Sequence, residues 1–282
     1  MDTVEQQTTV FSIKDLGALE GPLLVFGGVY SNLQALEQMM QIAKTRDIPA
    51  DRIICTGDMV GYCAHPEETI QLIRDWGIHC IAGNVELQLR DGEEDCGCDF
   101  NDGSRCDVFS RQWYPYAQSV LSESAIAWMH DLPYHIRFKY AGLQAQVVHG
   151  ALEHVSGYVF ASTPWERKAD QLNRAEADLI LGGHCGLPFN DHKEGKYWLN
   201  PGVIGMPAND ATTRVWYMIL DDQEAFSFQH HSFEYNHKAA AQAMRDKRLP
   251  EAYALTLETG LWDNCEILPE EETAAQGQRI EL

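Results

Sequence analysis

Four residues of metal-ligand type each follow a short apolar stretch of the chain: Asp58, Asn84, His149 and His184. Two imidazoles, a carboxylate and an amide oxygen form a donor set that suits Zn²⁺, Fe²⁺ or Mn²⁺. Because the ends of neighbouring strands meet at one edge of an open α/β sheet, we expect the four side chains to converge on one metal site. The alternative is that they are satisfied polar groups beneath the loops.

The segments around these residues alternate between strand and helix patterns. Residues 23–26, 52–55 and 78–82 are short apolar runs followed by glycine or polar residues, as buried strands are. Between them, 32–43 has apolar residues at helical spacing, and 66–76 begins with a proline, which favours a helix start. The order strand, helix, strand, helix, strand predicts an α/β domain.

The rest of the chain predicts further elements and one insertion. Thr163 and Glu166 form a capping-box pattern at the start of one helix. Residues 90–107 are acidic and rich in glycine and cysteine, so we expect an inserted loop there. We expect one domain over 1–250 and a C-terminal extension, 251–282, with a frayed acidic end. The expected helices cover about 108–121, 123–130, 163–173 and 236–247, and the expected strands 134–140, 144–148, 178–181, 214–220 and 225–231.

The composition favours a soluble cytoplasmic protein. Of 282 residues, 45% are hydrophobic, which is enough for a full core. The 42 acidic and 21 basic residues give a formal charge of -21, which disfavours nucleic-acid and membrane-surface partners. The first residues show no signal-peptide pattern, and no run approaches the ~18 apolar residues of a membrane span. The eight cysteines are therefore expected to be thiols or metal ligands. The oligomeric state stays open.

Six loop motifs occur in a fixed order: GGVYSN (27–32), GDMVGY (57–62), GNVE (83–86), HG (149–150), GGHCG (182–186) and NPGVIGMP (200–207). In order and spacing they resemble the calcineurin-like metallophosphoesterases, especially their small bacterial branch, over about residues 22–231. The resemblance implies an α/β fold in the form of a four-layer αββα sandwich, with two mixed β-sheets flanked by helices. It also implies hydrolysis of phosphate esters with two metal ions.

The ligand pattern of that family is D-x-H, GD, GNH[DE], H and GHxH, and this chain departs from it. Gly28 and Tyr30 replace the two ligands of D-x-H, and Gly186 replaces the second histidine of GHxH. Val85 replaces the histidine that serves the family as the acid toward the leaving group. Asp58, which bridges both metals in the family, is present.

The retained ligands are those of the family's second metal: Asp58, Asn84, His149 and His184. The first metal keeps only the bridging aspartate. The resemblance therefore implies a site for one divalent transition metal ion, Mn, Fe or Zn, with a second ion left open.

Five of the eight cysteines lie in or beside the loops of the site: Cys63, Cys96, Cys98, Cys106 and Cys185. We hypothesise that their thiolates rebuild the lost metal position, which would favour zinc, copper(I) or an iron–sulfur centre. The alternative is that the insert is an acidic lid and that Cys63 and Cys185 pack as small apolar residues.

Three more residues are candidates for roles beside the metal. Glu86 could replace the proton donor that is missing at Val85. Tyr30 could ligate ferric iron or hold a substrate phosphate, although a tyrosine at the rim of the site is the simpler interpretation. Asn32 is a candidate for the substrate pocket, and capping of the helix that begins there is the simpler role.

The sequence leaves three functions open. The first is a divergent metal-dependent phosphoesterase for a phosphorylated small molecule, with Asp58 and Glu86 as catalytic residues. The second is a non-hydrolytic metal-binding or regulatory protein that reuses the fold. The third is a metalloenzyme with different chemistry at a Cys-rich site. We favour the first.

Overall fold

The computed structural model describes residues 11–98 and 103–282, and its strands form two mixed β-sheets. The six-stranded sheet consists, in spatial order, of β1 (Ile13–Leu19), β5 (His135–Tyr140), β6 (Leu143–Val147), β7 (Leu179–Leu181), β9 (Lys196–Asn200) and β8 (Phe189–Lys193). The five-stranded sheet consists of β11 (Ser227–Phe233), β10 (Val215–Asp221), β2 (Leu23–Phe26), β3 (Ile53–Cys55) and β4 (His79–Cys80).

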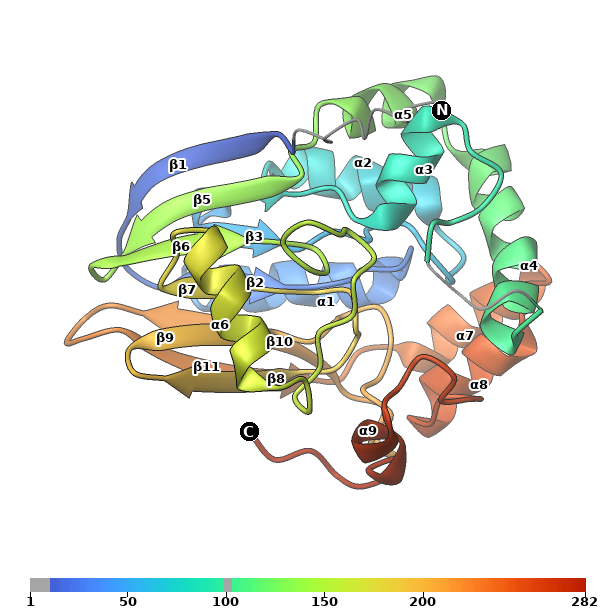
Figure 1. Cartoon of the computed structure of the whole chain (residues 1–282). Coiled ribbons are helices and arrows are strands. Elements are labelled where there is room, and N and C mark those ends of the chain that lie inside the picture. Colours follow the sequence, from blue (N-terminus) through green and yellow to red (C-terminus); the bar gives the residue numbers. More distant parts are fainter. Residues whose placement is uncertain (1–10, 99–102) are drawn as a thin grey trace, which may run out of the picture.

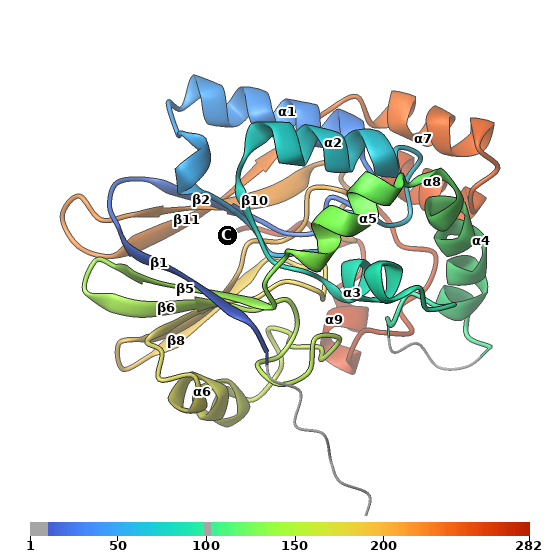
Figure 2. The same ribbon diagram turned by 90° about the horizontal axis from the view of Figure 1, so that it is seen from above.

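Helices cover the outer faces of both sheets (Figures 1 and 2). The six-stranded sheet is covered by α6 (Trp165–Arg174). On the five-stranded sheet and at its end lie α1 (Leu33–Thr45), α2 (Pro66–Trp76), α3 (Asn84–Asp91), α4 (Arg105–Val120), α5 (Glu123–His130), α7 (His237–Asp246) and α8 (Glu251–Thr259). A short 3-10 helix, Ala50–Arg52, and a terminal helix, α9 (Glu270–Ala274), complete the described elements. The four layers confirm the predicted αββα sandwich.

The central strand β2 explains how the layers are held together. Successive side chains of a strand point to opposite faces of its sheet. Leu23 and Val25 therefore belong to the core between the two sheets, whereas Leu24 and Phe26 belong to the core beneath the helices. All four are fully buried, which is why the segment reads as an unbroken apolar run.

The start of α2 was predicted correctly from the sequence, whereas the cap of α6 was not. α2 begins with Pro66 and ends at Gly77, whose φ of 74° is left-handed. The capping box predicted at Thr163 is wrong. The Thr163 hydroxyl accepts the N–H of Phe160, and α6 starts after Pro164 without a side-chain cap.

The elements that the sequence did not predict have weak patterns. β1 is an edge strand with mostly exposed residues, and β8 has the polar sequence FNDHK. Neither shows the alternation that marks a half-buried strand. α3 was also not predicted, because the glycine and asparagine that start it read as the end of a strand.

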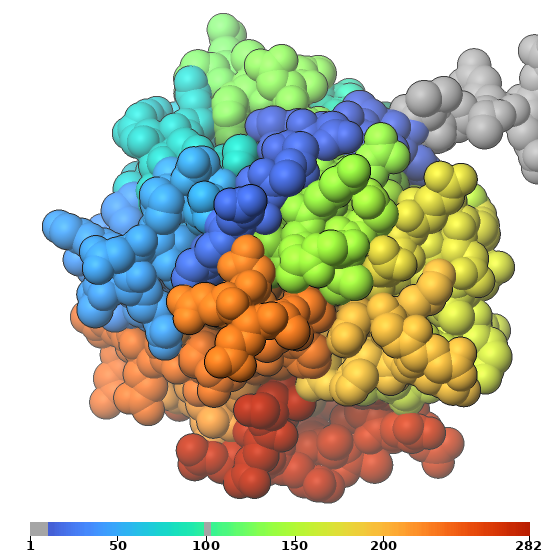
Figure 3. Space-filling model, turned by 90° about the vertical axis from the view of Figure 1, so that its left-hand side faces the viewer, coloured from blue at the N-terminus to red at the C-terminus, as the bar shows by residue number. Residues whose placement is uncertain are grey.

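The C-terminal extension is attached to the body of the protein, contrary to the expected fraying. Ala254 and Leu257 of α8 are fully buried in the core beneath the helices. Glu272 accepts hydrogen bonds from the backbone and hydroxyl of Ser162, and the Ile280 carbonyl accepts one from Arg214. In Figure 3 this segment is red and lies against the lower side of the molecule.

The predicted insertion, 90–107, lies partly outside the described residues. Its described ends include the last residues of α3 and the first turn of α4. In the part of the chain that the structure describes, no helix is both long and apolar enough to cross a membrane.

Candidate metal centre

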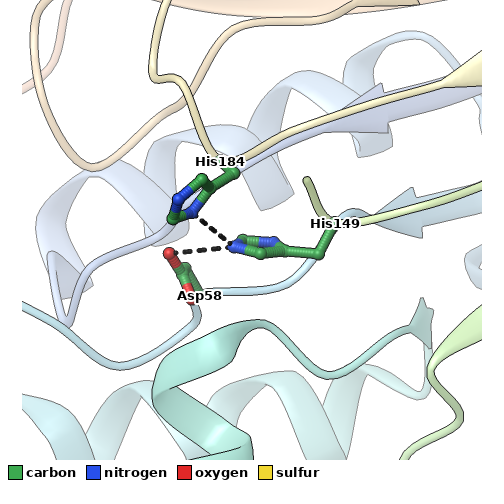
Figure 4. Close-up of side chains that lie close together, drawn as sticks. All are labelled: Asp58, His149 and His184. Carbon is green, nitrogen blue, oxygen red and sulfur yellow. Dashed lines mark hydrogen bonds and ion pairs between the residues drawn. The ribbon is translucent and has the colours of Figure 1, made fainter. Parts of the chain in front are cut away.

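The four expected ligands meet where strands of both sheets end. Asp58 follows β3 and Asn84 follows β4, whereas His149 follows β6 and His184 follows β7. All four are buried, with exposed fractions between 1% for Asn84 and 8% for His184. Figure 4 shows the carboxylate and the two imidazoles directed toward one another. The predicted convergence of these side chains is therefore present in the structure.

The Nε2 atom of His149 lies at the centre of this group. It is 3.2 Å from Oδ2 of Asp58 and 3.1 Å from Oδ1 of Asn84. It is also 3.1 Å from Nδ1 of His184. Such spacing brings one atom from each of four side chains to the same point.

Hydrogen bonds around the group fix which atoms face inward. Nδ1 of His149 lies 2.7 Å from the Thr56 carbonyl oxygen, to which it must donate, so Nε2 is the nitrogen that faces Asp58 and Asn84. Nδ2 of Asn84 donates to the Cys96 carbonyl at 2.8 Å and to Sγ of Cys98 at 3.3 Å, so the amide oxygen faces His149. The His149 nitrogen, the Asn84 oxygen and the Asp58 carboxylate thus face one another, as the ligands of one ion would.

Electrostatics keep Asp58 ionised and His184 neutral, and favour a positive charge on His149. Burial and the neighbouring His149 lower the pKa of His184 to about 3, so its imidazole is neutral. Burial alone would raise the pKa of Asp58, but the charge of His149 and its hydrogen bond outweigh burial and lower that pKa. Burial would likewise lower the pKa of His149, and Asp58 reverses the direction and raises it. The site therefore attracts positive charge.

A buried metal ion fits this arrangement. The Asp58 and Asn84 oxygens need a positive partner in a dry site, and a proton on Nε2 of His149 or a metal ion bound in its place supplies one. Two nitrogens and two oxygens match the ligand preferences of Zn²⁺, Fe²⁺ and Mn²⁺.

The backbone at the site is held in a conformation that most residues avoid. Asp58 has a φ of 55° and His184 a φ of 59°, both in the left-handed region. Each such residue costs on the order of 1 kcal/mol and persists where the surrounding structure enforces it, as at functional sites. Position 83 requires glycine, because a Cβ atom there would lie 2.1 Å from Oδ1 of Asp58.

Tyr30 occupies the space beside Gly28, where the family has its first metal ligands. A Cβ atom on Gly28 would lie 2.4 Å from Cζ of the Tyr30 ring, so an aspartate at this position would collide with the tyrosine. Tyr30 is only 5% exposed, and its ring lies 4.7 Å from that of Tyr62 in an edge-on contact. Tyr30 is thus held by its neighbours beside Asp58, and its role as a rim residue or in holding a phosphate stays a prediction.

An indole from the C-terminal extension covers the other lost ligand position. A Cβ atom on Gly186 would lie 3.3 Å from Cη2 of Trp262. The Trp262 indole is anchored by its Nε1–H, which donates to the Pro207 carbonyl at 2.8 Å. A histidine at position 186 would displace this ring. At Gly28, Tyr30 and Gly186 the family's metal ligands are absent, and aromatic rings fill the space that those ligands would occupy.

Glu86 positions the site and shows no geometry for the catalytic role that its sequence position suggested. It is fully buried, and its carboxylate accepts the backbone N–H groups of Asp58, Val60 and Gly83 at 2.9 to 3.0 Å. Burial and the nearby charge of Asp58 raise its pKa to about 7. Both carboxylate oxygens hold the Asp58 loop against the start of α3.

We expect Glu86→Ala to lower the free energy of unfolding by about 3 kcal/mol, because three buried N–H groups lose their acceptor at roughly 1 kcal/mol each. Glu86→Gln keeps one acceptor oxygen and is expected to lose only about 1 kcal/mol. Urea denaturation of both variants measures the difference. If Glu86→Gln keeps wild-type stability and abolishes turnover, the carboxyl acts in catalysis and the positioning role is wrong.

Asn32 is a helix cap and does not face the site. Its side-chain oxygen accepts the N–H of Ala35 at the start of α1. Its side-chain nitrogen donates to the Gly205 carbonyl and to the Tyr235 hydroxyl. The residue is fully buried, so the substrate-pocket role considered for it has no support.

The structure divides the five cysteines near the site. Cys96 and Cys98 are joined by a disulfide bond, which differs from the thiols expected for this chain. Cys63 is buried, with its Sγ near the Gly205 carbonyl. Cys106 and Cys185 line a pocket beside Asp58, together with Cys98. Among the described residues, the His, Cys, Asp and Glu side chains close enough to share an ion are Asp58, His149 and His184. Thiolate ligation therefore stays a prediction.

Two residues of the site were missed from the sequence. The Tyr158 ring lies 4.4 Å from the His184 imidazole, centroid to centroid, and its hydroxyl donates to the Cys98 carbonyl. Thr56 orients His149 through its backbone carbonyl. A contact made by a backbone carbonyl does not depend on the residue type, so the sequence does not reveal it. The only available signal was the position of Thr56 next to Gly57 and Asp58.

Fold and site together define a protein of the metallophosphoesterase class. Residues 23–225 match the family model of the calcineurin-like phosphoesterase superfamily domain, and the chain belongs to this superfamily. The resemblance drawn from the loop motifs is thereby confirmed.

Relatives with this fold come from archaea and bacteria. An uncharacterized protein of Methanocaldococcus jannaschii is 28% identical over 246 residues, covering 81% of this chain and 94% of that protein. A metallophosphoesterase from Sphaerobacter thermophilus has a TM-score of 0.67 at 23% identity, covering 86% of this chain and all of that one. A hypothetical protein from Pyrococcus horikoshii has a TM-score of 0.72 at 18% identity, covering 86% of this chain and 99% of that one. Both structures support the fold.

Proposed function

We propose that this protein is a phosphoesterase with a single divalent metal ion, held by Asp58, Asn84, His149 and His184. The observation that carries the proposal is the convergence of oriented electron-pair donors on Nε2 of His149. Manganese, iron and zinc are the candidates, because the donor set mixes imidazole nitrogens with carboxylate and amide oxygens. The proposed substrate is a phosphorylated small molecule.

The bound ion would polarise a phosphoryl oxygen and lower the pKa of a water molecule, which are the usual contributions of a metal to ester hydrolysis. Thr56 and the Cys96–Cys98 loop hold His149 and Asn84 in ligand orientation. Burial of these residues excludes bulk water from the ligand side. The residues present therefore fit a site for one ion.

The proposed enzyme lacks a side chain that would protonate the leaving group from the family's position. Val85 is apolar and buried there, and the carboxylate of Glu86 is occupied by backbone N–H groups. Esters whose leaving group is a poor base need such an acid least. We therefore expect the proposed activity to favour esters of acidic alcohols.

Turnover of p-nitrophenyl phosphate and bis-p-nitrophenyl phosphate with added Mn²⁺ tests the proposal. We expect His184→Ala to lower kcat/KM by more than about 100-fold. Mutation of a residue that only hydrogen-bonds a metal ligand lowers activity by about 10- to 100-fold, and loss of the ligand itself should lower it further. His192→Ala, on an exposed residue of β8, is the matched control. Absence of turnover by wild-type protein that carries its metal would favour the non-hydrolytic metal-binding alternative.

A further inference from the structure

A pocket opens directly beside the candidate metal centre. Asp58 and His184 form part of its wall. The rest of the wall is largely aromatic, and the rings belong to Tyr30, Tyr62, Tyr158, Tyr253 and Trp262. Any phosphate ester held at the metal would therefore place its organic group among these rings.

The C-terminal extension builds the far side of this aromatic pocket. Tyr253 and Thr256 come from α8, and Trp262 and Ile267 follow it. All four lie outside residues 23–225, the part of the chain that matches the superfamily domain. One side of the pocket is thus built by residues that lie beyond the part of the chain matched by the superfamily domain.

Three hydroxyl groups of the pocket lack protein partners. Tyr30, Tyr62 and Tyr253 line it, and none of their hydroxyls makes a hydrogen bond to another residue that the structure describes. The Tyr62 ring contacts the rings of Tyr30 and Tyr253, each at 4.7 Å. Buried hydroxyls normally have a partner, so these three O–H groups are available to a ligand that carries acceptor atoms.

The charge of the pocket limits what that ligand can be. The described residues of the wall include no lysine or arginine. Its carboxylates are Asp58, at the metal centre, and Asp263, which is paired with Arg105 at 2.8 Å. A second phosphate or a carboxylate on the ligand would lack a counter-charge, so the organic group should be uncharged.

The size of the pocket points to a single ring. Its cavity volume is about 80 Å³. At about 30 Å³ for each water molecule, this volume equals that of about three waters, which is close to the size of one small ring. A nucleoside is too large for it, whereas a six-membered ring fits and can make edge or face contacts with the tyrosines.

We propose that the pocket binds the ring of an uncharged aryl group, and that the substrate is the phosphate ester of a small phenol. The proposal rests on the proposed function and names its substrate class. In the reaction, a water oxygen bonds to phosphorus as the P–O(aryl) bond breaks, the phenolate leaves with the electron pair, and the proton of the water goes to solvent. A phenolate is a weaker base than an alkoxide, which agrees with the absence of an acid at Val85.

Calorimetric titration of metal-loaded protein with ligands that cannot be hydrolysed tests the pocket. Phenylphosphonate carries the ring and methylphosphonate does not. We expect the wild-type protein to bind phenylphosphonate about tenfold more tightly, as a buried aromatic contact allows. Trp262→Ala should remove this preference, and Tyr253→Phe, which keeps the ring packing, should leave it in place. Tyr197→Phe, on β9, is the control.

The outcomes separate the pocket from the proposed function. Equal affinity for the two phosphonates in wild-type protein, or a ring preference that survives in Trp262→Ala, overturns the inference. Tighter binding of phenyltrimethylammonium than of phenol also overturns it, because the pocket would then select a cation. If phenol binds in a Trp262-dependent manner and neither phosphonate binds, the aryl pocket stands and the phosphoesterase proposal fails.

Discussion

His149→Ala is expected to weaken the binding of Mn²⁺ or Zn²⁺ by at least about 100-fold, since it removes the atom at which the other ligands converge. Of the four candidate ligands, His149 has the most completely defined environment, with one nitrogen fixed by Thr56 and the other facing the cluster. Its loss leaves Asp58 and Asn84 without the nitrogen that they face. Competition with a chelator of known affinity, followed by metal analysis, gives the dissociation constants.

His154→Ala is the matched control for this experiment. His154 lies five residues further along the chain and is exposed, so its removal should leave metal affinity unchanged. Circular dichroism of both variants shows whether they are folded. A folded His149→Ala protein that binds the metal within about threefold of wild type would show that the ion lies elsewhere.

Gly28→Asp is expected to lower the free energy of unfolding by about 4 kcal/mol, from overpacking against the Tyr30 ring and from a buried carboxylate without a partner. Adding Tyr30→His removes the ring that collides with the new side chain. The double variant also restores the D-x-H pattern of the family. We expect it to recover most of the lost stability and, in the presence of Mn²⁺ or Zn²⁺, to bind more metal than wild type.

A double-mutant cycle with Tyr30→His alone supplies the control. Thermal or urea denaturation gives the four free energies of unfolding, and metal analysis gives the ion content of each protein. Simple additivity of the two substitutions would contradict the direct contact between position 28 and the Tyr30 ring. A Gly28→Asp protein as stable as wild type would do the same.

The sequence predicted the place of the candidate metal centre because that place depends on local patterns. Asp58, Asn84, His149 and His184 each follow an apolar run that becomes a buried strand, although these strands belong to two sheets and not to the one sheet that was expected. The same patterns predicted the layers of the fold. Motif order then tied the four residues to one family, which the match over 23–225 confirmed.

The sequence could not predict how the lost ligand positions were filled. Tyr30 packs against Gly28, and Trp262 packs against Gly186. Nothing in the type of these residues indicates which residue each of them contacts. Trp262 reaches the site from the C-terminal extension, for which the sequence predicted no contact with the site. The sequence also did not show which groups Glu86 contacts, so a proton-donor role was considered for it. Its carboxylate instead accepts three backbone N–H groups, which gives it a positioning role.

Metal content per chain tests the account most directly. Protein purified without air and exchanged into metal-free buffer, then titrated with Mn²⁺ or Zn²⁺, should retain one ion per chain by mass spectrometry of the metal. Crystals of that protein should show one anomalous peak, bounded by Asp58, Asn84, His149 and His184. Two ions per chain, or one ion at the cysteines and none among these four residues, would contradict the account.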